Sequence, residues 1–210
     1  MFPAARRRAV VDRLLHLYPL LLYALGGVCL LSWPITKTDT DLWFHLSWGR
    51  ELFERGAIPH ESTFSFITPP KSWVDYAWLF QALVSLCHAS AGYAGLIVLR
   101  SVLYLATTGL LLWFLLGRRA RETERGWRTF LYGLTWMILL PRYLLVRPFL
   151  WTDVFTMAFI TLLERRPRGI LVLPLLGILW CNLHGIAYPI LLLIGGAYSA
   201  EYLWSRLRGM

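Results

Sequence analysis

The sequence has little charge and few cysteines for its length. Only 16% of the 210 residues are charged, whereas a soluble domain has about 25%. This deficit argues against a soluble enzyme, and the 57% hydrophobic content excludes an intrinsically disordered chain. The three cysteines, Cys29, Cys87 and Cys181, are far apart in apolar segments, so neither a disulfide framework nor a cysteine metal site is predicted. We expect them to be buried small hydrophobic residues.

Several common catalytic and ligand-binding motifs are also missing. The sequence contains no G-x-S-x-G, no H-E-x-x-H, no Walker loop and no G-x-G-x-x-G. The 21 Lys and Arg residues flank apolar segments instead of forming one patch, so nucleic-acid binding is not expected. No internal repeat is evident, and this gives little support to a small transporter.

Long apolar segments are the main feature that is present. Residues 14–33 follow a basic start and cover about 30 Å as a helix, the thickness of the hydrocarbon core. The apolar core of a signal peptide is only about 7–15 residues long, so we expect an uncleaved first span. Five further spans are expected in apolar runs at 94–116, 129–145, 149–163, 170–183 and 186–204. The fold class is therefore predicted to be all-α, a polytopic membrane bundle of about six transmembrane helices.

One long outer loop, residues 34–93, is expected between the first two predicted spans, and its residues from 34 to about 76 are hydrophilic. Within it, residues 42–55 repeat aromatic and apolar side chains at helical spacing, and Glu51 and Arg55 form an i,i+4 pair. A second short apolar helix is expected at 78–91, ended by Gly92. Aromatic-rich amphipathic helices beside a membrane lie in its interface, so both are predicted to be interfacial.

The orientation follows from the charges on the two sides. If 78–91 does not cross, the inner segments hold 14 basic and 5 acidic residues, and the outer segments hold 6 basic and 7 acidic residues. This asymmetry obeys the positive-inside rule and explains the net charge of +9 without an anionic partner. We predict one membrane domain with cytoplasmic termini (1–13 and 205–210), a first span at 14–33, an outer loop at 34–93 and five further spans within 94–204.

The acidic pair Asp39 and Asp41 is the sharpest chemical feature of the outer loop. Both carboxylates come just before the predicted helix, and His45 shares a helix face with Asp41. Such a group suits a general base or a divalent-cation site. The alternative is that Asp41 is an N-cap, Asp39 is solvated and His45 is an interfacial residue.

Charged and polar residues at the ends of the spans are the second set of candidates. Arg142 and Arg147 suit a phosphate or pyrophosphate ligand, or alternatively extend to lipid headgroups. Asp153 is a candidate partner for Arg147. Arg100 lies deepest in a predicted span, where a charge usually faces an interior cavity. His184 lies at the outer end of the fifth span, either reaching the same cavity or hydrogen-bonded at the interface.

Several motifs together resemble the GT-C superfamily of polyprenyl-phosphate-dependent membrane glycosyltransferases, and more closely a poorly characterised bacterial group within it. The group's pattern is roughly D-x-D-x-W-x-H, G-x-x-P, F-S-F, W-x-x-x-E-W-L, R-P and W-x-N-L-H-G. The matching segments are 39–45, 56–59, 64–66, 73–79, 147–148 and 180–185. Ala77 replaces the glutamate of the fourth motif, although Asp75 is close.

The resemblance implies transfer of a sugar from a polyprenyl-phosphate donor, outside the membrane and with inversion. It implies a protein of the bacterial inner membrane in which Asp39 and Asp41 act as base or bind Mg²⁺ or Mn²⁺. The substrate-binding candidates are His45, Asp75, Arg100, Arg147, Asn182 and His184. The alternative is a non-catalytic subunit that binds a polyprenyl phosphate, a partner membrane glycosyltransferase or a second copy of the chain.

Overall fold

The computed structural model describes residues 4–35, 39–62, 69, 71–117, 122–165 and 167–209. The chain is all-α, with one short antiparallel pair of two-residue strands in the described part. The 64–66 motif lies outside the described residues. The elements are α1 (Ala4–Ser32), α2 (Thr40–Arg55), β1 (Glu61–Ser62), β2 (Lys71–Ser72), α3 (Trp78–Leu116), α4 (Glu122–Arg142), α5 (Phe149–Arg165), η1 (Pro167–Val172), α6 (Leu173–Leu183), η2 (Gly185–Ala187) and α7 (Tyr188–Leu207).

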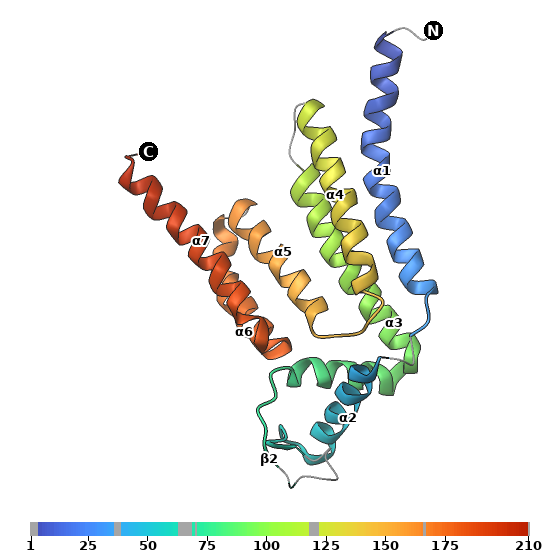
Figure 1. Cartoon of the computed structure of the whole chain (residues 1–210), viewed down its shortest axis with the longest axis vertical. Coiled ribbons are helices and arrows are strands. Elements are labelled where there is room, and N and C mark those ends of the chain that lie inside the picture. The colour runs from blue at the N-terminus through green and yellow to red at the C-terminus, as the bar shows by residue number, and fades with distance from the viewer. Residues whose placement is uncertain are drawn as a thin grey trace. The chain divides into compact units, whose positions relative to one another are not determined.

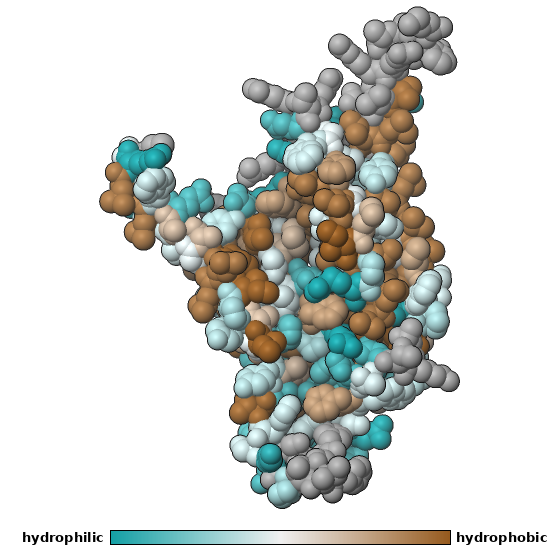
Figure 2. Space-filling model, in the orientation of Figure 1, coloured by the Kyte–Doolittle hydropathy of each residue, from teal (hydrophilic) through white to brown (hydrophobic). Residues whose placement is uncertain are grey.

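Long apolar helices indicate a membrane protein. Among the described residues, three segments are long and apolar enough to cross a bilayer: Arg13–Ser32, Trp78–Leu116 and Gly185–Leu207. Only 24% of the first segment and 11% of the third is buried within the chain, so their apolar side chains need another apolar environment. Figure 2 shows such side chains over the visible faces of α1 and α7. With 17 and 11 residues, α5 and α6 are shorter than the roughly 20 that a span needs.

The chain divides into two compact units. Unit 1 comprises Met1–Asp39 and Ala91–Val146, and unit 2 comprises Thr40–Ser90 and Arg147–Met210. The boundary within α3 lies beside Gly92, whose φ of 59° and ψ of −144° are not helical. Glycine adopts positive φ without the steric cost of a Cβ, so the predicted end of the 78–91 helix is confirmed as a break.

Unit 1 joins α1, the second part of α3 and α4, which run side by side (Figure 1). Arg100 is fully buried and donates to the carbonyl oxygens of Leu30 at 3.0 Å, of Leu144 at 2.8 Å, and of Trp33. The last carbonyls of a helix have no intrahelical donor. Pro34 has no N–H to offer Leu30, so the guanidinium of Arg100 replaces it at the end of α1.

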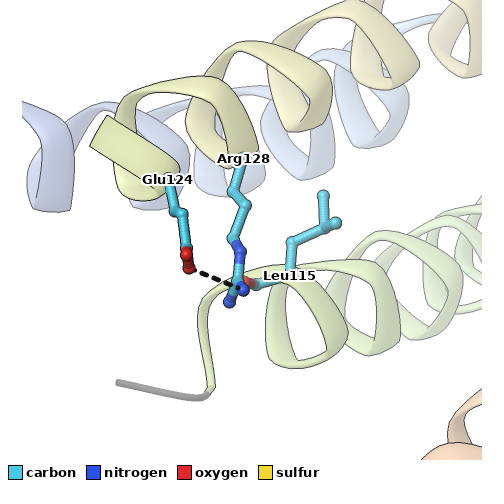
Figure 3. Close-up of polar contacts among 3 residues, drawn as sticks. All are labelled: Leu115, Glu124 and Arg128. Carbon is cyan, nitrogen blue, oxygen red and sulfur yellow. Dashed lines mark hydrogen bonds and ion pairs between the residues drawn. The ribbon is translucent and has the colours of Figure 1, made fainter. Parts of the chain in front are cut away.

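The other end of the same bundle uses a second arginine in the same way. Arg128 on α4 donates to the carbonyl oxygen of Leu115, near the end of α3, at 3.2 Å (Figure 3). It also pairs with Glu124 one turn earlier on α4, at 3.2 Å. A cation at a helix C-terminus is favourable because the helix dipole is negative there.

Unit 2 contains two helical groups. In the first, α2 packs closely on the start of α3: a Cβ at Gly49 would lie 2.1 Å from the carbonyl oxygen of Gln81, so only glycine fits there. In the second, α5 packs against α6 and α7 (Figure 1). A small hairpin precedes α3, with Glu61 opposite Ser72 and Ser62 opposite Lys71.

The helix boundaries follow the sequence predictions with some corrections. The helix predicted at 42–55 begins at Thr40, and the Glu51–Arg55 pair is confirmed. The first helix begins already at Ala4, and α4 begins at Glu122 instead of 129. Polar and basic residues precede both apolar runs and simply continue the helix.

Further corrections concern the C-terminal helices and the cysteines. The run at 170–183 is split, because residues up to Val172 form the 3₁₀ turn η1, and α7 continues past 204 to Leu207. All three cysteines are free, and none is fully buried, contrary to expectation: Cys29 and Cys87 are half-buried and Cys181 is exposed. It follows Trp180 on α6, which takes the buried side of the helix, and successive helical positions point about 100° apart.

Candidate functional site

An ion pair joins the start of α2 to the turn before α5 in unit 2. The Nη1 atom of Arg147 lies 2.7 Å from the Oδ2 atom of Asp41. Because α2 begins at Thr40, Asp41 lies inside the first helical turn and is not the N-cap residue of the alternative interpretation. Its carboxylate pairs with Arg147 instead. The side chains are 51% and 31% exposed for Asp41 and Arg147, so the pair is open to solvent. Pairs this exposed contribute at most about 1 kcal/mol to stability, so a ligand can compete for either partner at small cost.

Asp75 lies just before α3 and bonds locally. Its Oδ1 atom accepts from the backbone N–H of Ala77 at 2.9 Å and from the side-chain amide of Gln81 at 3.1 Å. Burial raises the pKa of the Asp75 carboxyl, and the two hydrogen bonds oppose that change. Asp75 thus shapes the entry into α3 through an Asx-type turn.

His184 is held by a buried chain of side chains from α5 and α6. Its Nδ1 atom lies 2.7 Å from the hydroxyl oxygen of Thr152, which also accepts from the indole N–H of Trp180 at 3.0 Å. Thr152 and Trp180 are 6% and 1% exposed. Burial lowers the pKa of His184, so the imidazole is favoured in its neutral form.

Two further contacts attach the loop before α3 to the end of α6. The indole N–H of Trp78 donates to the Oδ1 atom of Asn182 at 2.8 Å. The backbone N–H of Gly185 donates to the carbonyl oxygen of Tyr76 at 2.6 Å. A Cβ at Gly185 would lie 3.1 Å from that oxygen, which explains glycine after His184. Asp75, Asn182 and His184 are thereby brought to neighbouring positions in unit 2.

His45 takes part in an aromatic cluster. It is 9% exposed and meets the ring of Phe80 edge-to-face, with centroids 4.9 Å apart. Trp48 stacks on Trp73 with centroids 6.1 Å apart, and Phe44 meets both tryptophans edge-to-face. Its placement among these rings gives His45 a packing role between α2 and α3.

The remaining two candidates, Asp39 and Arg100, belong to unit 1. Asp39 is 3% exposed. The hydrogen bonds of Arg100 described above all go to backbone carbonyls, and these bonds assign it to helix-end capping. Unit 2 therefore gathers the other six predicted residues: Asp41, His45, Asp75, Arg147, Asn182 and His184.

A metal site is not assembled in the part of the chain that the structure describes. Within it, no group of three or more His, Cys, Asp and Glu side chains is close enough to hold an ion. Binding of Mg²⁺ or Mn²⁺ by Asp39 and Asp41 stays a prediction.

An apolar groove of about 580 Å³ reaches the polar cluster. Its lining includes Phe159 on α5, Gly177 and Ile178 on α6 and Leu191 on α7, and Asn182 stands among them. The same Asn182 accepts from Trp78, so the groove meets the cluster at this residue. An open apolar groove with the hydrogen-bonding side chain of Asn182 in its lining suits a ligand with a polar head and a hydrocarbon tail.

Sequence reasoning missed Thr152, Gln81 and the indole N–H groups of Trp78 and Trp180. Trp180 belongs to a recognised motif, so its position carried a signal. Thr152 and Gln81 carried none, because a single Thr or Gln in an apolar helix has many interpretations. The chain matches no protein-family model, no curated protein and no solved structure.

Proposed function

We propose that this chain is a GT-C-type membrane glycosyltransferase that transfers a sugar from a polyprenyl-phosphate donor to an acceptor on the outer side of the membrane. The observation that carries the proposal is the pair of Asp41 and Arg147. It sets a carboxylate of the first outer loop beside a cation suited to phosphate, and both are open to solvent.

The proposed topology is that of a multi-pass protein of the bacterial inner membrane, with about six spans and both termini in the cytoplasm. The three apolar helices and the excess of basic residues in the predicted inner segments support it. Residues 34–93 are then outside, and α2 with the first part of α3 lies in the interface.

Each charged group has a distinct part in the proposed reaction. A carboxylate, Asp41 or Asp39, removes the proton of the acceptor hydroxyl, whose oxygen bonds to the anomeric carbon of the sugar. The bond from that carbon to the phosphate oxygen breaks, and the polyprenyl phosphate leaves with the electron pair. Arg147 and His184 stabilise the departing phosphate. A phosphate that engages Arg147 also releases Asp41 from its ion pair.

The apolar groove supports a lipid-linked donor over a soluble nucleotide sugar. It extends from Asn182 along α5, α6 and α7, beside the end of α6 where His184 follows. A polyprenyl chain lying in this groove places its phosphate near the polar cluster.

Transfer by membranes containing the chain tests the proposal. We would supply a panel of labelled polyprenyl-phosphate hexoses and pentoses and measure label moved to an acceptor. Wild type is expected to use one donor, and Asp41→Asn to lose about 10²–10⁴-fold, the usual contribution of a general base. The matched control is Glu51→Gln, which removes a paired carboxylate from the same helix and is expected to keep full transfer. Unchanged transfer in both Asp39→Asn and Asp41→Asn contradicts the proposed base.

The second candidate is a non-catalytic subunit that binds a polyprenyl phosphate or a partner membrane protein, including a second copy. The exposure of α7 favours it, because a helix that is only 11% buried offers a large apolar face to a partner. This hypothesis predicts no transfer by the purified chain and co-purification with a larger glycosyltransferase. A monodisperse chain that is active alone contradicts it.

A further inference from the structure

The contact between His184 and Thr152 determines which ring nitrogen of His184 carries hydrogen. The Thr152 hydroxyl oxygen lies 2.7 Å from His184 Nδ1 and 3.0 Å from Trp180 Nε1. Among the described residues these two are the hydrogen-bond partners of that hydroxyl. A hydroxyl has one hydrogen to donate and two lone pairs that accept.

The indole nitrogen can only donate, so one lone pair of the hydroxyl is used by Trp180. If His184 Nδ1 also donated, the hydroxyl hydrogen of Thr152 would be buried without an acceptor, at a cost of about 1–3 kcal/mol. The favoured arrangement has Thr152 donating to an unprotonated Nδ1. The neutral ring then carries its hydrogen on Nε2.

The ring of Trp180 is held in one orientation by its neighbours, so its indole N–H is directed at the Thr152 hydroxyl. Its ring stacks on Phe155 with centroids 5.8 Å apart, and Phe159 meets it edge-to-face at 5.6 Å. Both phenylalanines lie on α5, the helix that carries Thr152. The packing of α5 against α6 therefore holds the indole donor, the hydroxyl and the imidazole in place.

We propose that Thr152 and Trp180 are positioning residues that hold His184 as the Nε2–H tautomer, and that this N–H donates to an oxygen of a phosphate group bound beside Arg147. The first half stands on the hydrogen bonds alone. The second half rests on the proposed function and names the part of the donor that His184 contacts.

A phosphate is favoured because of where His184 is attached. Its partner Thr152 lies in the first turn of α5, and Arg147 lies just before that helix. The N-terminus of a helix carries partial positive charge and attracts anions. A fixed Nε2–H donor adds directionality to the charge of Arg147, and it is retained at neutral pH because burial keeps the ring uncharged.

Nitrogen NMR of ¹⁵N-histidine-labelled chain in detergent tests the tautomer without any ligand. His184→Gln identifies the His184 signals by their loss. Wild type is expected to show an unprotonated shift at Nδ1 and a protonated shift at Nε2. Thr152→Val and Trp180→Phe are expected to move both signals toward a mixture of tautomers, and Thr152→Ser to restore the wild-type shifts.

The matched control is Thr161→Val on the same helix. Thr161 is 1% exposed, and its hydroxyl has no hydrogen-bond partner among the described residues. This change removes a buried hydroxyl from α5 without touching His184, so the His184 shifts should stay unchanged. A protonated Nδ1 in wild type, or wild-type shifts in both Thr152→Val and Trp180→Phe, overturns the assignment.

The ligand is tested by adding a polyprenyl monophosphate, the matched polyprenol or inorganic phosphate to the same sample. A shift of the Nε2 signal with the lipid phosphate alone identifies a lipid source, and a shift with inorganic phosphate as well identifies the phosphate group itself. No shift with either phosphate, or an equal shift with polyprenol, overturns phosphate recognition. The ligand-free tautomer stands if the proposed function fails, so the two failures are distinguishable.

Discussion

In unit 1, most polar side chains with described partners bond to backbone carbonyls, whereas in unit 2 several bond to other side chains far away in the sequence. Arg100 and Arg128 bind helix-end carbonyls, and Trp136 on α4 donates to the carbonyl oxygen of Leu22 on α1 at 2.8 Å. In unit 2, Asp41 meets Arg147 and Thr152 meets His184.

We interpret this difference as one between a scaffold and a candidate site. A side chain that satisfies a helix-end carbonyl has its donors occupied and cannot serve a ligand without exposing that carbonyl. A side chain paired with another side chain can exchange its partner for a ligand group of the same charge. The comparison predicts large losses of stability where a fully buried polar side chain of unit 1 is replaced, and small losses at the exposed ion pair of unit 2.

Substitution of Arg100 by leucine should have the largest effect on stability. The carbonyls of Leu30, Trp33 and Leu144 would lose a charged donor inside the bundle. A hydrogen bond to a charged group contributes about 1.5–3 kcal/mol, so we expect a total loss of about 3 kcal/mol or more. The measurement is the thermal unfolding midpoint of the purified chain in detergent.

The control for this prediction is Arg128→Leu in the same unit. Arg128 is partly exposed, bonds to one carbonyl oxygen (that of Leu115) and pairs with Glu124 at the surface, so its loss should cost only about 1 kcal/mol. Equal midpoints for Arg100→Leu and wild type would mean that Arg100 is not a structural donor.

Substitution of Gly49 by alanine should have the next largest effect, and it tests whether unit 2 also has a rigid part. The new Cβ would lie 2.1 Å from the carbonyl oxygen of Gln81 and would force α2 away from α3. Overpacking of this kind costs about 1–3 kcal/mol. Gly196→Ala on α7 meets no atom and should be neutral or stabilising by up to about 1 kcal/mol. Thermal midpoints that rank the two variants in the opposite order would contradict the α2–α3 packing.

The ion pair of Asp41 and Arg147 should contribute little to stability. A double-mutant cycle with Asp41→Asn and Arg147→Gln is expected to give a coupling free energy below about 1 kcal/mol, because both side chains are exposed. The cycle is measured by chemical unfolding in detergent. A coupling free energy of several kcal/mol would mean that the pair stabilises the fold, and this would contradict the proposed difference between the two units.

The pH dependence contributed by His184 should be a smaller effect again. Burial lowers its pKa, so as the pH falls through 6.5 the unfolded chain takes up the proton more readily and the free energy of unfolding decreases. His184→Gln should therefore lose less stability than wild type between about pH 7.5 and about pH 5.5. The opposite slope would mean that the folded chain favours the imidazolium.

Asp75 changes the pH dependence of the free energy of unfolding with the opposite sign, and it does so at lower pH. Burial raises its pKa, so its contribution is full below 3.8 and is lost as the pH rises through the raised value. Asp75→Asn keeps both hydrogen bonds of the Oδ1 atom without a buried charge. We expect it to match or slightly exceed wild-type stability near neutral pH, as measured by the thermal midpoint.

Much of the helical layout could be predicted from local patterns. The helix at 42–55, the Glu51–Arg55 pair and the break at Gly92 depend on residues within one or two turns of each other. The roles of individual polar residues could not be predicted in the same way. Asp41 was a candidate base or metal ligand, with an N-cap as the alternative, and it pairs with Arg147. Arg100 was a candidate for ligand binding and donates to carbonyls.

Local patterns alone predict an all-α chain with long apolar helices, because apolar composition and helical periodicity are properties of consecutive residues. They also identify the segments that hold the candidate site, through the acidic pair and the W-x-N-L-H-G motif. Which polar groups face one another depends on how the helices pack in three dimensions. Trp78 and Asn182, 104 positions apart, meet because the start of α3 lies at the end of α6 in unit 2, and nothing in the spacing of either segment encodes that contact.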